Sequence, residues 1–143
     1  MPSLQEVGLA VKRLQWRHHR AANTRLAPLG LSLVQWDVLR HLHAEPAASL
    51  HDLALLTFQT DQSMGALAGR MVDRGLLERV GGPGRAVRHR LTAQGEEARQ
   101  AGSELLDVVL RESFGGLTEE QLDQLHGLLT AAARQAQDAD RRS

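Results

Sequence analysis

The apolar periodicity of this 143-residue chain changes at Gly75. Before Gly75, apolar residues recur three and four positions apart, which is typical of amphipathic helices. After it come two short runs, residues 76–80 and 86–91, and between them lies the glycine-rich segment 81–84. This second pattern is typical of a β-hairpin. The chain therefore predicts a set of helices followed by one hairpin.

Side chains that can cap a helix stand where the predicted helices after the first begin. A first helix is expected over residues 4–26, from apolar residues on two of its sides. Ser32 with Gln35 forms a capping box for a second helix, which ends before Pro46. Ser49 and Thr60 are expected to cap two further helices, the second of which ends at Gly75. Two helices joined by a tight turn predict a helix–turn–helix.

Two more helices are expected after the hairpin. Thr92 opens one over about 93–114, which Gly115 and Gly116 end, and Thr118 with Gln121 opens the last. The fold class is therefore mainly α with a small β-hairpin: a winged helix-turn-helix with N- and C-terminal dimerisation helices. We expect one domain over 1–143, divided into dimerisation helices (4–30 and 93–137), a DNA-binding lobe (32–92) and a frayed polar tail (138–143).

Charge is segregated along the chain, although 17 basic and 17 acidic residues balance overall. Residues 12–25 hold five cations and no acid, and residues 79–90 hold four cations and no acid. Residues 96–123 hold eight acids and two cations. This distribution indicates one surface suited to a polyanion such as DNA, and another kept away from it.

The helix after Thr60 has the chemistry to read base edges in the major groove. Gln62 can pair bidentately with adenine, Ser63 can bond a base or a phosphate, and Ala66 can contact a thymine methyl group. Asp61 would repel phosphate, or it serves the helix dipole. The hairpin supplies cations for phosphates, with Arg85 able to enter the minor groove. The predicted DNA contacts are Gln59, Thr60, Gln62, Ser63, Gly65, Ala66, Arg70, Arg85, Arg88 and Arg90. The alternatives are a polar solvated helix face and an edge strand protected by charge.

Three motifs of the chain are LSLVQWDVL at 31–39, GLLER at 75–79 and RLTAQG at 90–95. In their order and spacing they resemble the landmarks of the MarR family of transcriptional regulators. The resemblance implies a two-fold dimer tied by its first and last helices, and usually a repressor released by a small, often phenolic, molecule or an oxidant. Two departures stand out. Ala66 occupies a position where the family often has Arg, and a shorter segment ending in Arg85 replaces an Asp-x-Arg pattern in the wing.

Apolar lines on the first and last helices expose more surface than one small domain hides, which also predicts a homodimer and a pseudo-palindromic operator. An effector pocket for a small aromatic or anionic molecule is expected at Trp16, His19, Arg20 and Trp36. The alternative is that both tryptophans belong to the core. The seven histidines show no metal-binding pattern, and a zinc site shared by His19 and His41 is the less favoured hypothesis. No metal or cofactor is predicted, and without cysteine a thiol cannot sense oxidants.

No enzyme motif is found, neither a nucleophile elbow nor a P-loop. The chain also lacks an apolar run long enough to cross a membrane and an N-terminal signal pattern, so we expect a cytoplasmic protein. The predicted function is a sequence-specific regulator that binds double-stranded DNA as a dimer. The main alternative is a winged-helix protein-interaction module without DNA binding, suggested by Ala66 and by the neutral total charge.

Overall fold

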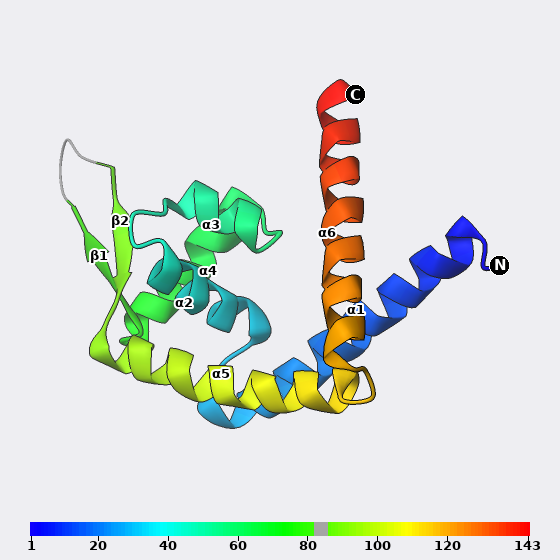
Figure 1. Cartoon of the computed structure of the whole chain (residues 1–143). Helices are drawn as coiled ribbons and strands as arrows, with labels where there is room; N and C mark the ends of the chain where they lie inside the picture. Colours follow the sequence, from blue (N-terminus) through cyan, green and yellow to red (C-terminus); the bar gives the residue numbers. More distant parts are fainter. Residues whose placement is uncertain (82–85) are drawn as a thin grey trace. The chain divides into compact units, whose positions relative to one another are not determined.

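The computed structural model describes residues 1–81 and 86–143. In chain order (Figure 1), its elements are α1 (Leu4–Leu26), a 3-10 turn η1 (Ala27–Leu29), α2 (Leu33–Ala44), α3 (Leu50–Leu56), α4 (Asp61–Asp73), β1 (Leu77–Val80), β2 (Arg88–Leu91), α5 (Ala93–Phe114) and α6 (Glu119–Arg142). They divide into two compact units, Met1–Val109 and Leu110–Ser143. Within the described residues, no helix is long and apolar enough to cross a membrane. The predicted fold class, mainly α with one hairpin, is confirmed.

The predicted caps are present and explain where the helices begin. The Ser32 hydroxyl accepts a hydrogen bond from the Gln35 amide at 3.2 Å, and the Gln35 side chain accepts one from the Ser32 amide at 3.0 Å. Ser49 and Thr118 form the same kind of box, and Thr60 caps α4. Each such cap stabilises a helix by about 1 kcal/mol, because it satisfies an amide that would otherwise lack a partner.

The core of the first unit lies among α2, α3, α4 and the hairpin. One apolar stripe of each helix turns inward, and the side chains of Leu39, Leu53 and Met64 are fully buried. Helix α3 contacts α4, α4 contacts β1, and α2 contacts β2. These contacts hold the outer face of α4 beside the hairpin, and this arrangement positions the candidate site.

Helix α5 closes this core from below the hairpin in Figure 1. The indole Nε1 of Trp36 on α2 donates a hydrogen bond to the carbonyl of Arg99 at 3.0 Å. A Cβ at Gly102 would collide with the Trp36 ring, so glycine is what allows α2 and α5 to approach this closely. Leu106, one turn further along α5, is also buried.

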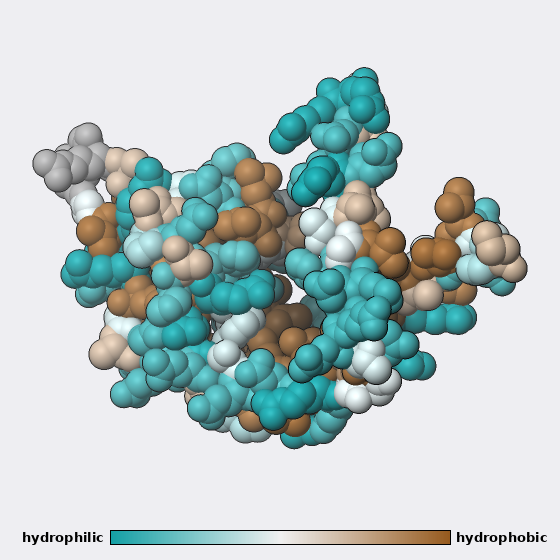
Figure 2. Space-filling model, viewed as in Figure 1, coloured by the Kyte–Doolittle hydropathy of each residue, from teal (hydrophilic) through white to brown (hydrophobic). Residues whose placement is uncertain are grey.

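Helix α1 is buried at its C-terminal end and exposed along its N-terminal half. Ala22 and Leu26 belong to the core, and the Asn23 side chain accepts a hydrogen bond from the Leu33 amide at 2.8 Å. Towards the N-terminus, Leu4 and Val7 lie exposed, and Figure 2 shows hydrophobic residues gathered along this half of the helix. The first unit therefore leaves half of the apolar surface of α1 uncovered.

The second unit consists of the end of α5 and helix α6. Helix α6 is amphipathic, yet none of its 24 residues is buried. Leu122, Leu128 and Leu129 are all exposed, and Leu125 is half-buried. Residues 138–142 belong to α6, which continues to Arg142, and the fraying of this tail stays a prediction. Arg141 and Arg142 lie in the last turn, where cations favour the helix dipole.

The hairpin is shorter than the sequence pattern predicts at both ends. The strands pair antiparallel from Leu77 with Leu91 to Val80 with Arg88, so residues 86 and 87 lie outside the ladder. Gly81 adopts φ +107°, which ends β1 before it can pair with them. The Leu76 amide donates instead to the Met71 carbonyl and so completes the end of α4.

Candidate nucleic-acid interface

Helix α4 presents one buried face and one exposed face. Thr60 caps it, since its hydroxyl accepts a hydrogen bond from the Ser63 amide at 3.0 Å. The buried face consists of Met64, Leu67, Ala68 and Met71. The opposite face exposes Asp61, Gln62, Ser63, Ala66 and Arg70. The predicted base-reading side chains thus share a single accessible surface, and Gly65 at its edge is half-buried.

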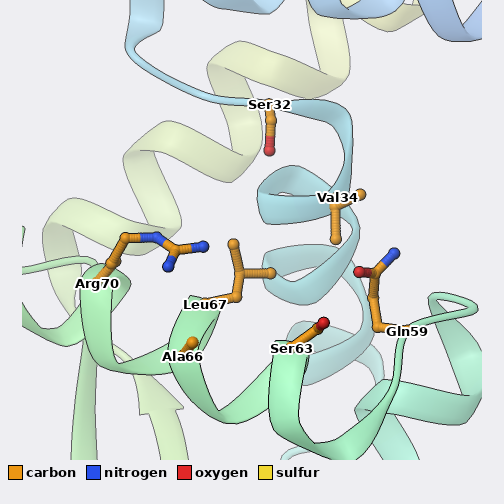
Figure 3. A pocket seen from close by; sticks show the side chains of 7 residues that line it. All are labelled: Ser32, Val34, Gln59, Ser63, Ala66, Leu67 and Arg70. Carbon is orange, nitrogen blue, oxygen red and sulfur yellow. The ribbon is translucent and has the colours of Figure 1, made fainter.

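A shallow pocket of about 370 Å³ lies along this exposed face. Figure 3 shows Gln59 and Ser63 at one end and the Arg70 side chain at the other, with Ala66 and Leu67 between them. The start of α2 closes the far side through Ser32 and Val34. Sequence reasoning missed these two residues. Their signal was the cap at Ser32, which places the open end of α2 on the surface.

The hairpin places its described cations unequally. Arg88 and Arg90 are both exposed on β2, on the face opposite the buried His89. Arg90 forms an ion pair with Glu78 across the ladder, so its charge is already compensated. Arg88 instead acts on Asp52 of α3, whose pKa it lowers in addition to the larger effect of hydrogen bonds from Ser49. Arg85 lies outside the described residues.

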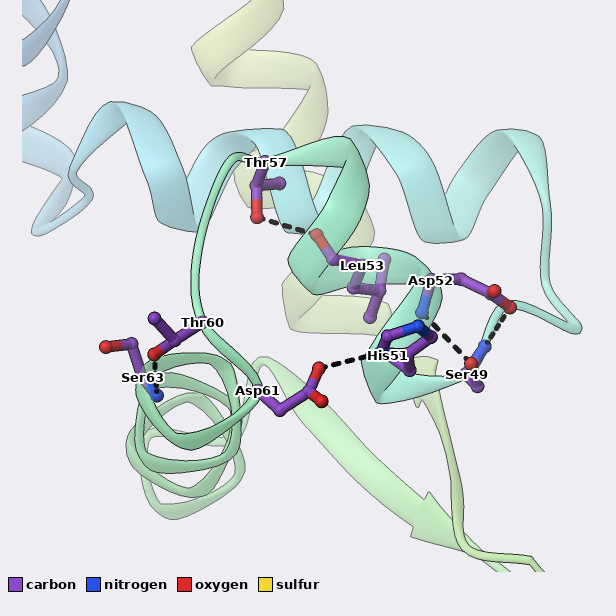
Figure 4. Close-up of polar contacts among 8 residues, drawn as sticks. All are labelled: Ser49, His51, Asp52, Leu53, Thr57, Thr60, Asp61 and Ser63. Atoms are coloured by element: carbon purple, nitrogen blue, oxygen red, sulfur yellow. Dashed lines mark hydrogen bonds and ion pairs between the residues drawn. The ribbon is translucent and has the colours of Figure 1, made fainter. Parts of the chain in front are cut away.

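A polar network links α3 to the start of α4 (Figure 4). His51 Nδ1 on α3 lies 2.9 Å from Asp61 Oδ1, the first residue of α4. This hydrogen bond and the charge of Asp61 raise the pKa of His51 above its ordinary value. On the buried side of the turn, the Thr57 hydroxyl donates to the Leu53 carbonyl at 2.6 Å. The pair between His51 and Asp61 was not predicted.

The inner face of the hairpin holds His89. It is buried, and no buried side-chain nitrogen or oxygen in the described part of the chain lacks a hydrogen-bond partner. Burial, with the positive charge of Arg79 beside it, lowers the pKa of His89. A neutral imidazole is therefore the form that packs beneath the interface.

The four residues predicted to line an effector pocket lie in two different environments. On α1, Trp16 is exposed and stacks on His19, with ring centroids 5.8 Å apart, and Arg20 is also exposed. Trp36 belongs to the core, and the Arg40 guanidinium lies 5.1 Å from its ring centroid. Trp36 therefore matches the alternative interpretation as a core residue, and the pocket itself stays a prediction. Across residues 1–81 and 86–143, no group of three or more potential metal ligands is found.

A sequence model of the MarR family matches residues 29–86. No curated protein matches the sequence. Among solved structures, a MarR family transcriptional regulator from Rhodococcus sp. RHA1 superposes with a TM-score of 0.83 at 20% identity, covering 93% of this chain and 98% of that one.

Two further solved structures were determined with bound molecules. A mutant MarR from E. coli complexed with operator DNA has a TM-score of 0.78 at 21% identity, covering 88% of this chain and 92% of that one. A MarR family protein from Mycobacterium tuberculosis in complex with salicylic acid has a TM-score of 0.74 at 24% identity, covering 92% and 97%. The predicted resemblance to the MarR family is confirmed, and the chain has the fold of these regulators.

Proposed function

We propose that this chain, which matches the MarR family in residues 29–86 and has the fold of MarR family transcriptional regulators, is itself a dimeric DNA-binding regulator. The observation that carries the proposal is the single exposed face of α4, beside a hairpin with a cation on its outer side. A relative of the same fold was solved with operator DNA. On this proposal the chain acts in the cytoplasm and has no catalytic role.

On this proposal the exposed side chains of α4 read the bases. Gln62 has the amide geometry to pair with adenine N6 and N7, and Ala66 offers a methyl group to thymine. Arg70 lies at the end of the 370 Å³ pocket, within the same face. Since no arginine occupies position 66, discrimination between bases rests on polar contacts that are individually weaker than a bidentate arginine–guanine pair.

On this proposal the hairpin contributes most of the affinity for DNA. Arg88 is exposed and forms no ion pair within the hairpin ladder, whereas Arg90 has Glu78 as its partner. An arginine that must leave a carboxylate before binding phosphate gains less free energy from the exchange, by about 0–1 kcal/mol for an exposed pair such as this one. We therefore assign phosphate contacts to Arg88 and a smaller share to Arg90. The contact predicted for Arg85 rests on its sequence position alone.

Dimerisation is the proposed use of the exposed apolar surfaces. The amphipathic helices α1 and α6 keep long apolar stretches exposed within their own units. Exposed apolar surface of this kind marks a protein interface. A two-fold pair would place two α4 helices on successive major grooves, so the operator is expected to be pseudo-palindromic, with half-sites about 34–36 Å apart.

The finer proposal is that the dimer is a repressor released by a small aromatic or anionic effector. Its support is the relative solved with salicylic acid and the stacked Trp16 and His19 on an exposed stretch of α1. Arg20 could then meet an anionic group. Trp36 is buried and its N–H already binds the Arg99 carbonyl, so that N–H does not serve an effector.

Binding to the DNA upstream of its own gene tests the proposal. Wild-type protein should bind at low salt, and its affinity should fall about a thousandfold or more between about 50 and 200 mM salt if six or more phosphates are contacted. Arg88→Ala should weaken binding to every sequence and reduce the salt slope by about one, as should Arg85→Ala. Arg90→Ala is the matched control and should have the smaller effect. Gln62→Ala should relax sequence preference by about 1–3 kcal/mol.

Two outcomes would contradict the proposal. Absence of binding by the wild type at low salt would exclude a DNA-binding regulator and favour a protein-interaction module. Binding whose affinity does not change with salt would show that no phosphates are neutralised.

A further inference from the structure

A carboxylate stands at the point where the proposed recognition helix meets DNA. Asp61 is the first residue of α4, next to Gln62 and Ser63. Phosphates bring negative charge to this end of the helix, so an uncompensated carboxylate weakens binding. The structure supplies a partner, since His51 on α3 lies 2.9 Å away (Figure 4).

The pair is exposed, which leaves part of the imidazole available. The side chains of His51 and Asp61 are 65% and 70% exposed. Nδ1 faces Asp61, so the second ring nitrogen, Nε2, is not used by this contact. A protonated imidazole carries an N–H on both nitrogens. It can therefore hold Asp61 with one N–H and donate the other to a phosphate oxygen.

The charges around His51 come from three elements. Asp61 approaches it from α4, Asp52 stands beside it on α3, and Arg88 of β2 acts on Asp52. Hydrogen bonds from Ser49 keep Asp52 ionised within the α3 cap. With neutral His51 the pair carries one negative charge, and with protonated His51 it carries none.

Resting on the function proposed above, we propose that His51 is a DNA-contacting residue, which neutralises Asp61, donates to a backbone phosphate and couples binding to the uptake of a proton. The first helix of a helix–turn–helix crosses the DNA backbone, which is where a residue of α3 would meet phosphate.

The sign of the pH dependence follows from this arrangement. Asp61 raises the pKa of His51 in the free protein, and a nearby phosphate would raise it further in the complex. The complex therefore binds more protons than the free protein between these two values. DNA affinity is highest below the pKa of the free protein and falls as pH rises, by at most about tenfold per pH unit for each protomer.

The test compares affinity for the DNA upstream of its own gene between about pH 6 and pH 8.5 at fixed low salt. His51→Gln keeps a donor for Asp61 but cannot take a charge. It should lower affinity by about three- to tenfold at the acid end, with little change at the alkaline end. Asp61→Asn should strengthen binding at the alkaline end and flatten the profile.

A second histidine–carboxylate pair provides a matched control. His43 Nδ1 lies 3.2 Å from Glu96 and joins α2 to α5, away from α4. His43→Gln should leave the DNA pH profile unchanged. Circular dichroism should show unchanged folding for all three variants, because each replaced side chain is at least half exposed.

The possible results separate the proposed function from the proposed role of His51. Absence of binding by the wild type at acid pH and low salt would overturn the proposed function. Normal wild-type binding with a pH profile that persists in His51→Gln would overturn the role of His51. Equal loss at both ends of the pH range in His51→Gln would do the same, since it would show that the ring acts without its proton.

Discussion

The DNA-binding lobe and helix α6 use the same amphipathic pattern with opposite results. In the lobe, the apolar stripes of α2, α3 and α4 are buried against one another. In α6, Leu122 and Leu129 of the apolar stripe remain exposed, and no residue of the helix is buried. Helix α1 shows both outcomes, with Leu26 buried and Leu4 exposed. Apolar periodicity therefore indicates that a helix face will be covered, but not whether the same chain covers it.

Truncating one leucine in each of these two regions should show the largest difference between them, in the free energy of unfolding that is lost. Leu39→Ala removes a fully buried side chain and should lower the free energy of unfolding by about 2–5 kcal/mol. Leu128→Ala removes one that is 70% exposed, and its direct effect should lie within about 0.5 kcal/mol. Chemical denaturation followed by circular dichroism measures both.

Varying the protein concentration tests whether a second copy of the chain covers α6. If a second copy covers α6, the loss caused by Leu128→Ala should grow as the protein is concentrated, because dimerisation stabilises only the folded state. The loss caused by Leu39→Ala should stay constant. A large, concentration-independent effect of Leu128→Ala would show that α6 is covered by its own chain.

Acid should also destabilise the DNA-binding lobe through His89, by less than Leu39→Ala does. Its pKa is lowered by burial and by Arg79, so the unfolded chain binds the proton more readily. The stability contributed by neutral His89 is complete above about pH 6.5 and is lost as pH falls through the folded pKa. Melting temperatures at about pH 7.5 and 5.5 should differ less in His89→Leu than in the wild type.

A histidine of α6 provides the control for this measurement. His126→Gln changes an exposed position and should leave the difference between the two melting temperatures unchanged. If His89→Leu kept the full acid sensitivity of the wild type, another group would be responsible. His41, whose pKa burial also lowers, is the first to test.

Local rules were sufficient to predict most of the fold. Ser32, Ser49, Thr60, Thr92 and Thr118 were each predicted to open a helix, and each does so. These features could be predicted because a cap and its helix lie within four residues of one another. The exposed face of α4 followed from the same kind of short-range periodicity.

Contacts between elements could not be predicted in the same way. The pairs His51–Asp61 and Arg90–Glu78 join residues ten and twelve positions apart, and they depend on how two elements pack. Phe58 adopts φ +59°, a left-handed conformation in which glycine would be expected. This conformation lets the Gln59 amide donate a hydrogen bond to the Ala54 carbonyl at 2.8 Å. A left-handed residue often ends a helix in this way, but glycine or asparagine usually occupies the position, so Phe58 gave no signal in local propensity.

The most direct test of the account is the mass, by sedimentation, of the complex between this protein and the DNA upstream of its own gene. We predict two chains per DNA site for the wild type and for Gln124→Glu, which adds a charge at another exposed position of α6. Introducing Leu122→Glu and Leu129→Glu together should give monomers that still fold and bind DNA far more weakly. A single wild-type chain bound to DNA, or an unchanged dimer in the double variant, would contradict the account.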